Sequence, residues 1–186
     1  GAEAMPALHA AHPRRMDNTE EYQCVYHEKM LKIIAARPYL WATHQWNMFD
    51  FAADARNQGG EPGMNHKGLV TFDRQLKKDA FFLYKAYWSS EPFVHICGKR
   101  FAKRTGKRLK IKVYSNAAEV TLYQNGRRAG TQTAAGVFEF TVPAENTNDI
   151  CAVAGTCRDE ARFLRVPRLP KEYKLRNAGA KKSWEK

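Results

Sequence analysis

The stretch from Trp46 to Lys67, WNMFDFAADARNQGGEPGMNHK, contains the residues best suited to bind a ligand. A short apolar run that carries Trp46 and Asp50 passes directly into a long polar loop that ends in Asn65, His66 and Lys67. Core strands are usually closed by brief turns, so a loop of this length with several amide and charged groups is typical of a binding site. The pattern predicts a ligand site mounted on the end of a strand.

The flanking segments indicate which elements position this loop. Residues 18–36 place apolar side chains three and four residues apart, behind an Asn or Thr cap, which predicts an amphipathic helix that ends before Pro38. Residues 39–49 are aromatic and apolar without that period, which predicts a strand buried on both faces. Residues 77–88 repeat the helical pattern. This order of elements is typical of a parallel α/β domain.

Beyond Pro92 the period of the apolar residues changes to two. The pattern predicts six or seven short antiparallel strands separated by Gly, Asn and basic turns. The Asn-Gly pair within QNGRR is a strong turn signal, because both residues tolerate positive φ. An immunoglobulin-like sandwich fits this arrangement. The sequence therefore predicts an α/β region at 1–90, an all-β region at 91–166 and a basic, extended tail at 167–186.

The composition limits the classes of function. The chain is 44% apolar and 12% aromatic, which predicts packed cores rather than disorder. It has no apolar run long enough for a membrane span, and its first residues do not have the pattern of a signal peptide. The formal charge is +12, with eight basic residues at 99–112, but solvated strand edges explain this segment better than nucleic-acid binding. We expect neither a nucleic-acid nor a membrane partner.

The spacing of cysteine and histidine argues against a metal or redox site. The four cysteines are scattered singly without a Cys-x-x-Cys pair, and the six histidines form no metal-binding motif. We therefore expect buried thiols, no structural metal and no cofactor.

Residues 1–90 are expected to be part of a larger domain, because a single buried strand leaves its N–H and C=O groups unpaired on both edges. Four motifs in fixed order are specific: GAEAMPALHAAHPRRMDNTEEYQCVYHEKMLKII, WNMFDFAADARNQGG, GMNHKGLVTFDRQLKKDAFFLYKAYWS and PFVHICGKRF. Together they resemble the C-terminal part of glycoside hydrolase family 2, the β-galactosidase and β-glucuronidase family. The resemblance runs from residue 1 to about residue 160.

The resemblance implies that residues 1–90 are the last part of a TIM (β/α)8 barrel, followed by the immunoglobulin-like domain. In this family the nucleophilic glutamate lies in a Ser/Thr-Glu-Tyr-Gly motif on the seventh strand, and the acid/base glutamate lies further upstream. Gly1 matches the last residue of that motif, so Glu3 does not match the nucleophile. A retaining glycosidase needs both carboxylates, so the chain alone is predicted to contain no catalytic residue and to be inactive.

The resemblance also implies roles for residues of the opening stretch. Trp46 matches the tryptophan that faces the sugar, with a core tryptophan as the alternative, and its peptide bond to Asn47 is expected to be cis. Asp50 either bonds a sugar hydroxyl or pairs with a buried partner. Asn65 and Lys67 match the Asn-x-Lys motif that holds the sugar carboxylate in β-glucuronidases. A loop ion pair is the alternative for Lys67.

These features predict a fragment of a retaining exo-β-glycosidase that hydrolyses terminal β-galactosides, because the helix after the loop is more similar to members described as β-galactosidases. The first alternative is a β-glucuronidase or β-galacturonidase that binds a sugar carboxylate. The second is a stand-alone sandwich module that binds glycans or a polyanion. The expected partners are a carbohydrate substrate and the rest of the barrel with the N-terminal domains, and an oligomer is compatible with the sequence. No feature identifies the compartment, although the resemblance implies a bacterial protein of the cytoplasm or periplasm.

Overall fold

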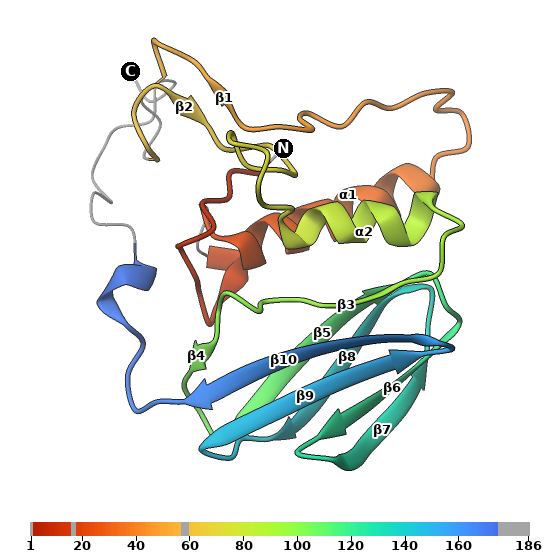
Figure 1. Ribbon diagram of the computed structural model, residues 1–186. Helices are drawn as coiled ribbons and strands as arrows, with labels where there is room; N and C mark the ends of the chain where they lie inside the picture. Colours follow the sequence, from red (N-terminus) through yellow and green to blue (C-terminus); the bar gives the residue numbers. More distant parts are fainter. Residues whose placement is uncertain (1, 16–17, 57–59, 175–186) are drawn as a thin grey trace. The chain divides into compact units, whose positions relative to one another are not determined.

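The computed structural model describes residues 2–15, 18–56 and 60–174, which form two compact units (Figure 1). One unit spans residues 1–81 together with the segment that begins at Lys171, and the other spans residues 82–170. Within the described ranges, no helix is both long and apolar enough to cross a bilayer.

The predicted N-terminal helix is present as α1 (Glu20–Ala35), after a short 3-10 helix, η1 (Pro13–Arg15). The Thr19 hydroxyl accepts a hydrogen bond from the Tyr22 N–H at 3.3 Å, so Thr19 caps the first turn. The most buried side chains of α1 are polar or small: Glu20, Gln23, Cys24 and His27. Burial lowers the pKa of His27 to about 4, so this imidazole is neutral at pH 7.

The buried strand predicted at residues 39–49 is absent, so this prediction is wrong. The segment is irregular, and Tyr39 is 75% and Trp41 95% exposed. Its end at Phe49 forms an isolated parallel bridge with Val70. A strand buried on both faces needs hydrogen-bond partners along both edges, and the described residues supply a partner segment only at this end.

The polar loop contains a short hairpin that the sequence did not predict. Its arms are β1 (Phe51–Ala52) and β2 (Met64–Asn65), which pair antiparallel (Figure 1). Phe51 lies opposite Asn65, so the hairpin brings the first residues of the loop next to its last residues.

The second predicted helix is present as α2 (Asp79–Trp88). Ala80 and Leu83 are fully buried, as expected from the apolar period of this segment. Two lysines precede the helix in different environments, since Lys78 is fully buried and Lys77 is exposed.

Residues 94–165 form two β-sheets, which agrees with the all-β character predicted for residues 91–166 (Figure 1). One sheet has the order β4-β10-β9-β6-β7 and the other the order β3-β5-β8. The strands are β3 (Val94–Ile96), β4 (Lys103–Arg104), β5 (Arg108–Ser115), β6 (Glu119–Gln124), β7 (Arg127–Thr133), β8 (Gly136–Pro143), β9 (Thr147–Ala154) and β10 (Cys157–Arg165). Alternate side chains of both sheets enter one apolar core, among them Ile111, Phe138, Leu122 and Ile150.

The strand pairing differs from the prediction in two respects. The short strand β4 pairs with β10 in parallel, although only antiparallel strands were expected. The strand β7 has no apolar alternation, so the sequence pattern did not show it. The predicted Asn-Gly turn is confirmed, because Asn125 and Gly126 have φ of 50° and 78° between the antiparallel strands β6 and β7.

Basic residues of the segment 99–112 have structural partners. Lys99 Nζ lies 2.5 Å from Asp159 Oδ1, and the Arg104 guanidinium lies 3.9 Å from the centroid of the Phe163 ring. The same guanidinium donates to the backbone carbonyls of Gly98, Phe101 and Lys110. These contacts fit the explanation of the segment as strand edges.

The start of the predicted tail forms a short helix, η2 (Lys171–Tyr173), while residues 175–186 lie outside the described ranges. The Tyr173 carbonyl accepts a hydrogen bond from the His9 N–H at 3.0 Å. The four cysteines form no disulfide among the described residues. Cys24 and Cys97 are buried as predicted, whereas Cys151 and Cys157 are half-buried.

Candidate functional site

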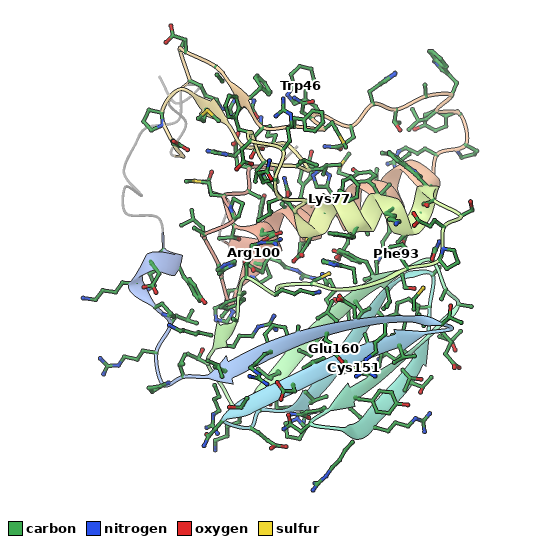
Figure 2. The ribbon with its side chains drawn as sticks, in the orientation of Figure 1. Trp46, Lys77, Phe93, Arg100, Cys151 and Glu160 are labelled. Carbon is green, nitrogen blue, oxygen red and sulfur yellow. The ribbon has the colours of Figure 1, made fainter. Side chains whose placement is uncertain are left out.

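Trp46 stands at the surface of the unit formed by residues 1–81 (Figure 2). It is 61% exposed, and its ring contacts that of Phe51 edge-on at 5.8 Å between centroids. The Trp46–Asn47 peptide bond is cis, which confirms the expectation from the resemblance. An exposed indole does not fit the alternative of a core tryptophan.

Backbone hydrogen bonds join the residues after Trp46 to those around Lys67. The Asn47 N–H donates to the Lys67 carbonyl at 3.3 Å, and the Leu69 N–H donates to the Asn47 carbonyl at 3.0 Å. The bridge between Phe49 and residue 70 continues this pairing. The two ends of the opening stretch, separated by a long loop, therefore lie side by side.

Asn65 is buried and Lys67 half-buried, and the Asn65 side chain bonds the Lys67 backbone. Asn65 Oδ1 accepts a hydrogen bond from the Lys67 N–H at 3.0 Å, which closes a tight turn around residue 66. Among the described residues, neither Asn65 Nδ2 nor Lys67 Nζ has a hydrogen-bond or ion-pair partner. The loop ion pair considered for Lys67 is therefore not present in the described part of the chain.

Asp50 is buried beneath this turn and is paired with a cation. Its Oδ1 accepts hydrogen bonds from Lys78 Nζ at 2.8 Å and from the Gly68 N–H at 2.9 Å. Its Oδ2 lies 3.3 Å from His66 Nδ1. Burial lowers the pKa of Lys78, and the Asp50 charge opposes that shift. These contacts favour the buried-pair alternative for Asp50 over direct contact with a sugar.

Glu3 and His66 extend this buried polar cluster. Glu3 Oε2 accepts a hydrogen bond from the His66 N–H at 2.7 Å, and its other oxygen pairs with Arg56. His66 Nε2 lies 3.1 Å from Glu61 Oε2. The Glu3 carboxylate is thus held by internal partners, which fits the expectation that it is not a nucleophile.

Sequence reasoning missed Lys78 as a member of this region. Lys77 and Lys78 are identical neighbours before a helix, and nothing local distinguishes the buried lysine from the exposed one. Its partner Asp50 lies 28 residues away, so the contact depends on how the loop folds back.

The site thus combines the exposed aromatic ring of Trp46 with an amide donor at Asn65 and an ammonium group at Lys67, on segments joined by backbone hydrogen bonds. Such a set can bind a polar ring with an anionic substituent, because the aromatic face covers C–H groups and the two donors bind an anion. The carboxylates of Glu3 and Asp50 are paired with Arg56 and Lys78, so both are held by internal partners.

Comparisons with known proteins show that this chain is similar to glycosidases. No protein-family model matches the sequence. A β-glucuronidase from Bacteroides fragilis is 46% identical over 116 residues, which are 62% of this chain and 17% of the relative. The crystal structure of an FMN-binding β-glucuronidase from Facaelibacterium prausnitzii L2-6 matches 93% of this chain and 27% of its own, with a TM-score of 0.87 and 46% identity.

Two further solved structures bear on the class of sugar. A putative β-galactosidase from Bacteroides fragilis matches 89% of this chain and 27% of its own, with a TM-score of 0.81 and 34% identity. Bacteroides uniformis β-glucuronidase 2, covalently bound to cyclophellitol-6-carboxylate aziridine, matches 90% of this chain and 22% of its own, with a TM-score of 0.77 and 30% identity.

The chain is therefore related to a segment of glycoside hydrolases. These matches confirm the resemblance to glycoside hydrolase family 2, the β-galactosidase and β-glucuronidase family. The chain spans 17% of the first curated relative and 27% of the first solved structure.

Proposed function

We propose that this chain is the C-terminal part of a retaining exo-β-glycosidase that acts on terminal β-glucuronides. The observation that carries the proposal is the pair of donors at Asn65 Nδ2 and Lys67 Nζ, which have no partner among the described residues. An ammonium group beside an amide N–H favours a sugar that bears a carboxylate over a neutral one. Trp46 would supply the aromatic face against the sugar ring.

The relatives support the glucuronide over the galactoside that the sequence alone favoured. The relative and two of the three structures described above are β-glucuronidases, and one of these is covalently bound to a carboxylate-bearing compound. The covalent complex also supports a retaining mechanism, which forms a glycosyl-enzyme intermediate. A terminal β-galactoside is the second candidate substrate, because one related structure is a putative β-galactosidase.

The architecture is part of the same proposal. Residues 1–90 would be the last part of a (β/α)8 barrel, residues 91–166 an immunoglobulin-like domain and residues 167–186 a basic tail. The exposed aromatic segment 39–49 supports this, because the missing edge partners would come from the rest of the barrel. The nucleophile and the acid/base carboxylate would also lie there, so residues of this chain bind the sugar without performing the bond cleavage.

Replacing Lys67 in the full-length polypeptide tests the substrate class. In Lys67→Ala, kcat/KM for a nitrophenyl β-glucuronide should fall by about thirty- to a thousandfold, or on the order of 2 to 4 kcal/mol, because the sugar carboxylate loses its cation. The same measurement on the nitrophenyl β-galactoside should change far less.

Lys77→Ala is the matched control, since this lysine is exposed and lies before α2. It should leave both substrates unaffected. If Lys67→Ala lowers both activities equally, Lys67 holds the loop instead of binding the carboxylate, and the galactoside becomes the better candidate.

A further inference from the structure

Lys78 is a buried cation directly before α2, whereas its neighbour Lys77 (labelled in Figure 2) is exposed. Lys78 Nζ donates to Asp50 Oδ1 at 2.8 Å and to the His66 carbonyl at 3.0 Å. Its backbone N–H donates to the Leu69 carbonyl at 2.8 Å. One residue is thus anchored to both sides of the turn that carries Lys67.

Asp50, the partner of Lys78, contacts the same turn through both of its carboxylate oxygens. The same Oδ1 that pairs with Lys78 accepts the Gly68 N–H at 2.9 Å, and Oδ2 lies 3.3 Å from His66 Nδ1. The approach is so close that a Cβ at Gly68 would lie 2.1 Å from the Asp50 nitrogen. The ion pair therefore contacts the residue before Lys67 and the residue after it.

We propose that the buried Lys78–Asp50 pair is a positioning pair that aims Lys67 at the carboxylate of an anionic sugar. The proposal rests on the proposed function, because it assigns selectivity to the same site. A buried ion pair is a weak source of stability, since apolar residues of similar volume often serve as well. The Lys78–Asp50 pair contacts the residues on both sides of Lys67. We therefore assign it the role of fixing the backbone from which the flexible Lys67 side chain extends.

The expected size of the effect follows from geometry. A displacement of about 1 Å in a substrate-positioning group can cost on the order of a hundredfold in rate. In the proposed arrangement, Lys78 contacts neither the sugar nor the reacting atoms. Replacing Lys78 should therefore affect the reaction only through the position of Lys67.

The test uses the full-length polypeptide and compares Lys78→Met with Lys77→Met. Lys78→Met should lower kcat/KM for the nitrophenyl β-glucuronide about ten- to a hundredfold and should change that for the β-galactoside far less. Lys77→Met should leave both values unchanged. In a background of Lys67→Ala, adding Lys78→Met should cause no further loss of glucuronide selectivity, because both changes remove the same interaction.

An equal loss for both substrates, or a further loss of selectivity in the double variant, would overturn the positioning role. If Lys78→Met fails to fold, the variant Asp50→Asn with Lys78→Met removes both buried charges together and should show the same selective loss. Full glucuronide selectivity in that variant also overturns the proposal. If Lys67→Ala itself leaves selectivity unchanged, the proposed function fails, and the positioning role fails with it.

Discussion

Three consecutive residues, Asn65, His66 and Lys67, have three different environments. The Asn65 side chain accepts a hydrogen bond from the Lys67 N–H. The His66 ring contacts the carboxylates of Asp50 and Glu61. Lys67 Nζ has no partner among the described residues. The roles proposed for Asn65 and Lys67 come from the resemblance. The contacts of His66 with Asp50 and Glu61 could not be predicted from the sequence, because the folding of the loop brings these residues together.

Gly68 gives a prediction at the scale of a single residue. Gly68→Ala would place a Cβ 2.1 Å from the Asp50 nitrogen and 2.3 Å from the Phe49 carbonyl carbon, so the two segments must move apart. We expect thermal unfolding of the full-length polypeptide to show a loss of about 3 kcal/mol or more, together with weaker binding of a glucuronide inhibitor.

Gly60→Ala is the control on the same loop, because a Cβ there meets its nearest neighbour at an ordinary 3.5 Å. It should be close to neutral. Equal stability of Gly68→Ala and Gly60→Ala would contradict the close approach of the two segments.

At the scale of elements, the sequence predicted what depends on local periodicity. The helices α1 and α2 and the apolar strands of residues 82–170 follow from spacings of three to four or of two. The strand predicted at 39–49 is absent from the structure, because strand formation depends on partners distant in sequence, which local periodicity does not show. The sequence did not predict β7, because the residues of this strand do not alternate between apolar and polar. It did not predict β4, because that strand is only two residues long.

The exposed segment 39–49 gives a prediction for an element. If it packs against the rest of a barrel, the isolated 186-residue chain should bind a dye specific for apolar surface, since Trp41 is 95% exposed. The full-length polypeptide should bind much less dye per mole, measured by fluorescence at equal concentration.

The variant Trp41→Gln should reduce dye binding to the isolated chain and serves as the matched control. Weak dye binding together with a single cooperative melting transition of the isolated chain would favour the stand-alone module instead.

For the whole molecule, the proposed function implies an active site that is shared between this segment and other parts of a longer chain. The described residues offer an aromatic face and two donors, while the carboxylates of Glu3 and Asp50 are held by Arg56 and Lys78. Under the proposed function, bond cleavage would depend on residues outside this segment, and Asn65 and Lys67 would select the sugar. A (β/α)8 barrel would allow this division, because loops from several strands meet at one face of such a barrel.

A crystal structure of the full-length polypeptide with a bound glucuronate-type inhibitor would show whether this segment binds the sugar carboxylate. We expect Lys67 Nζ and Asn65 Nδ2 both to lie within about 3.2 Å of the sugar carboxylate, with the Trp46 ring against the sugar. The contrary result is a carboxylate held by residues outside this chain, with Lys67 turned away from the pocket.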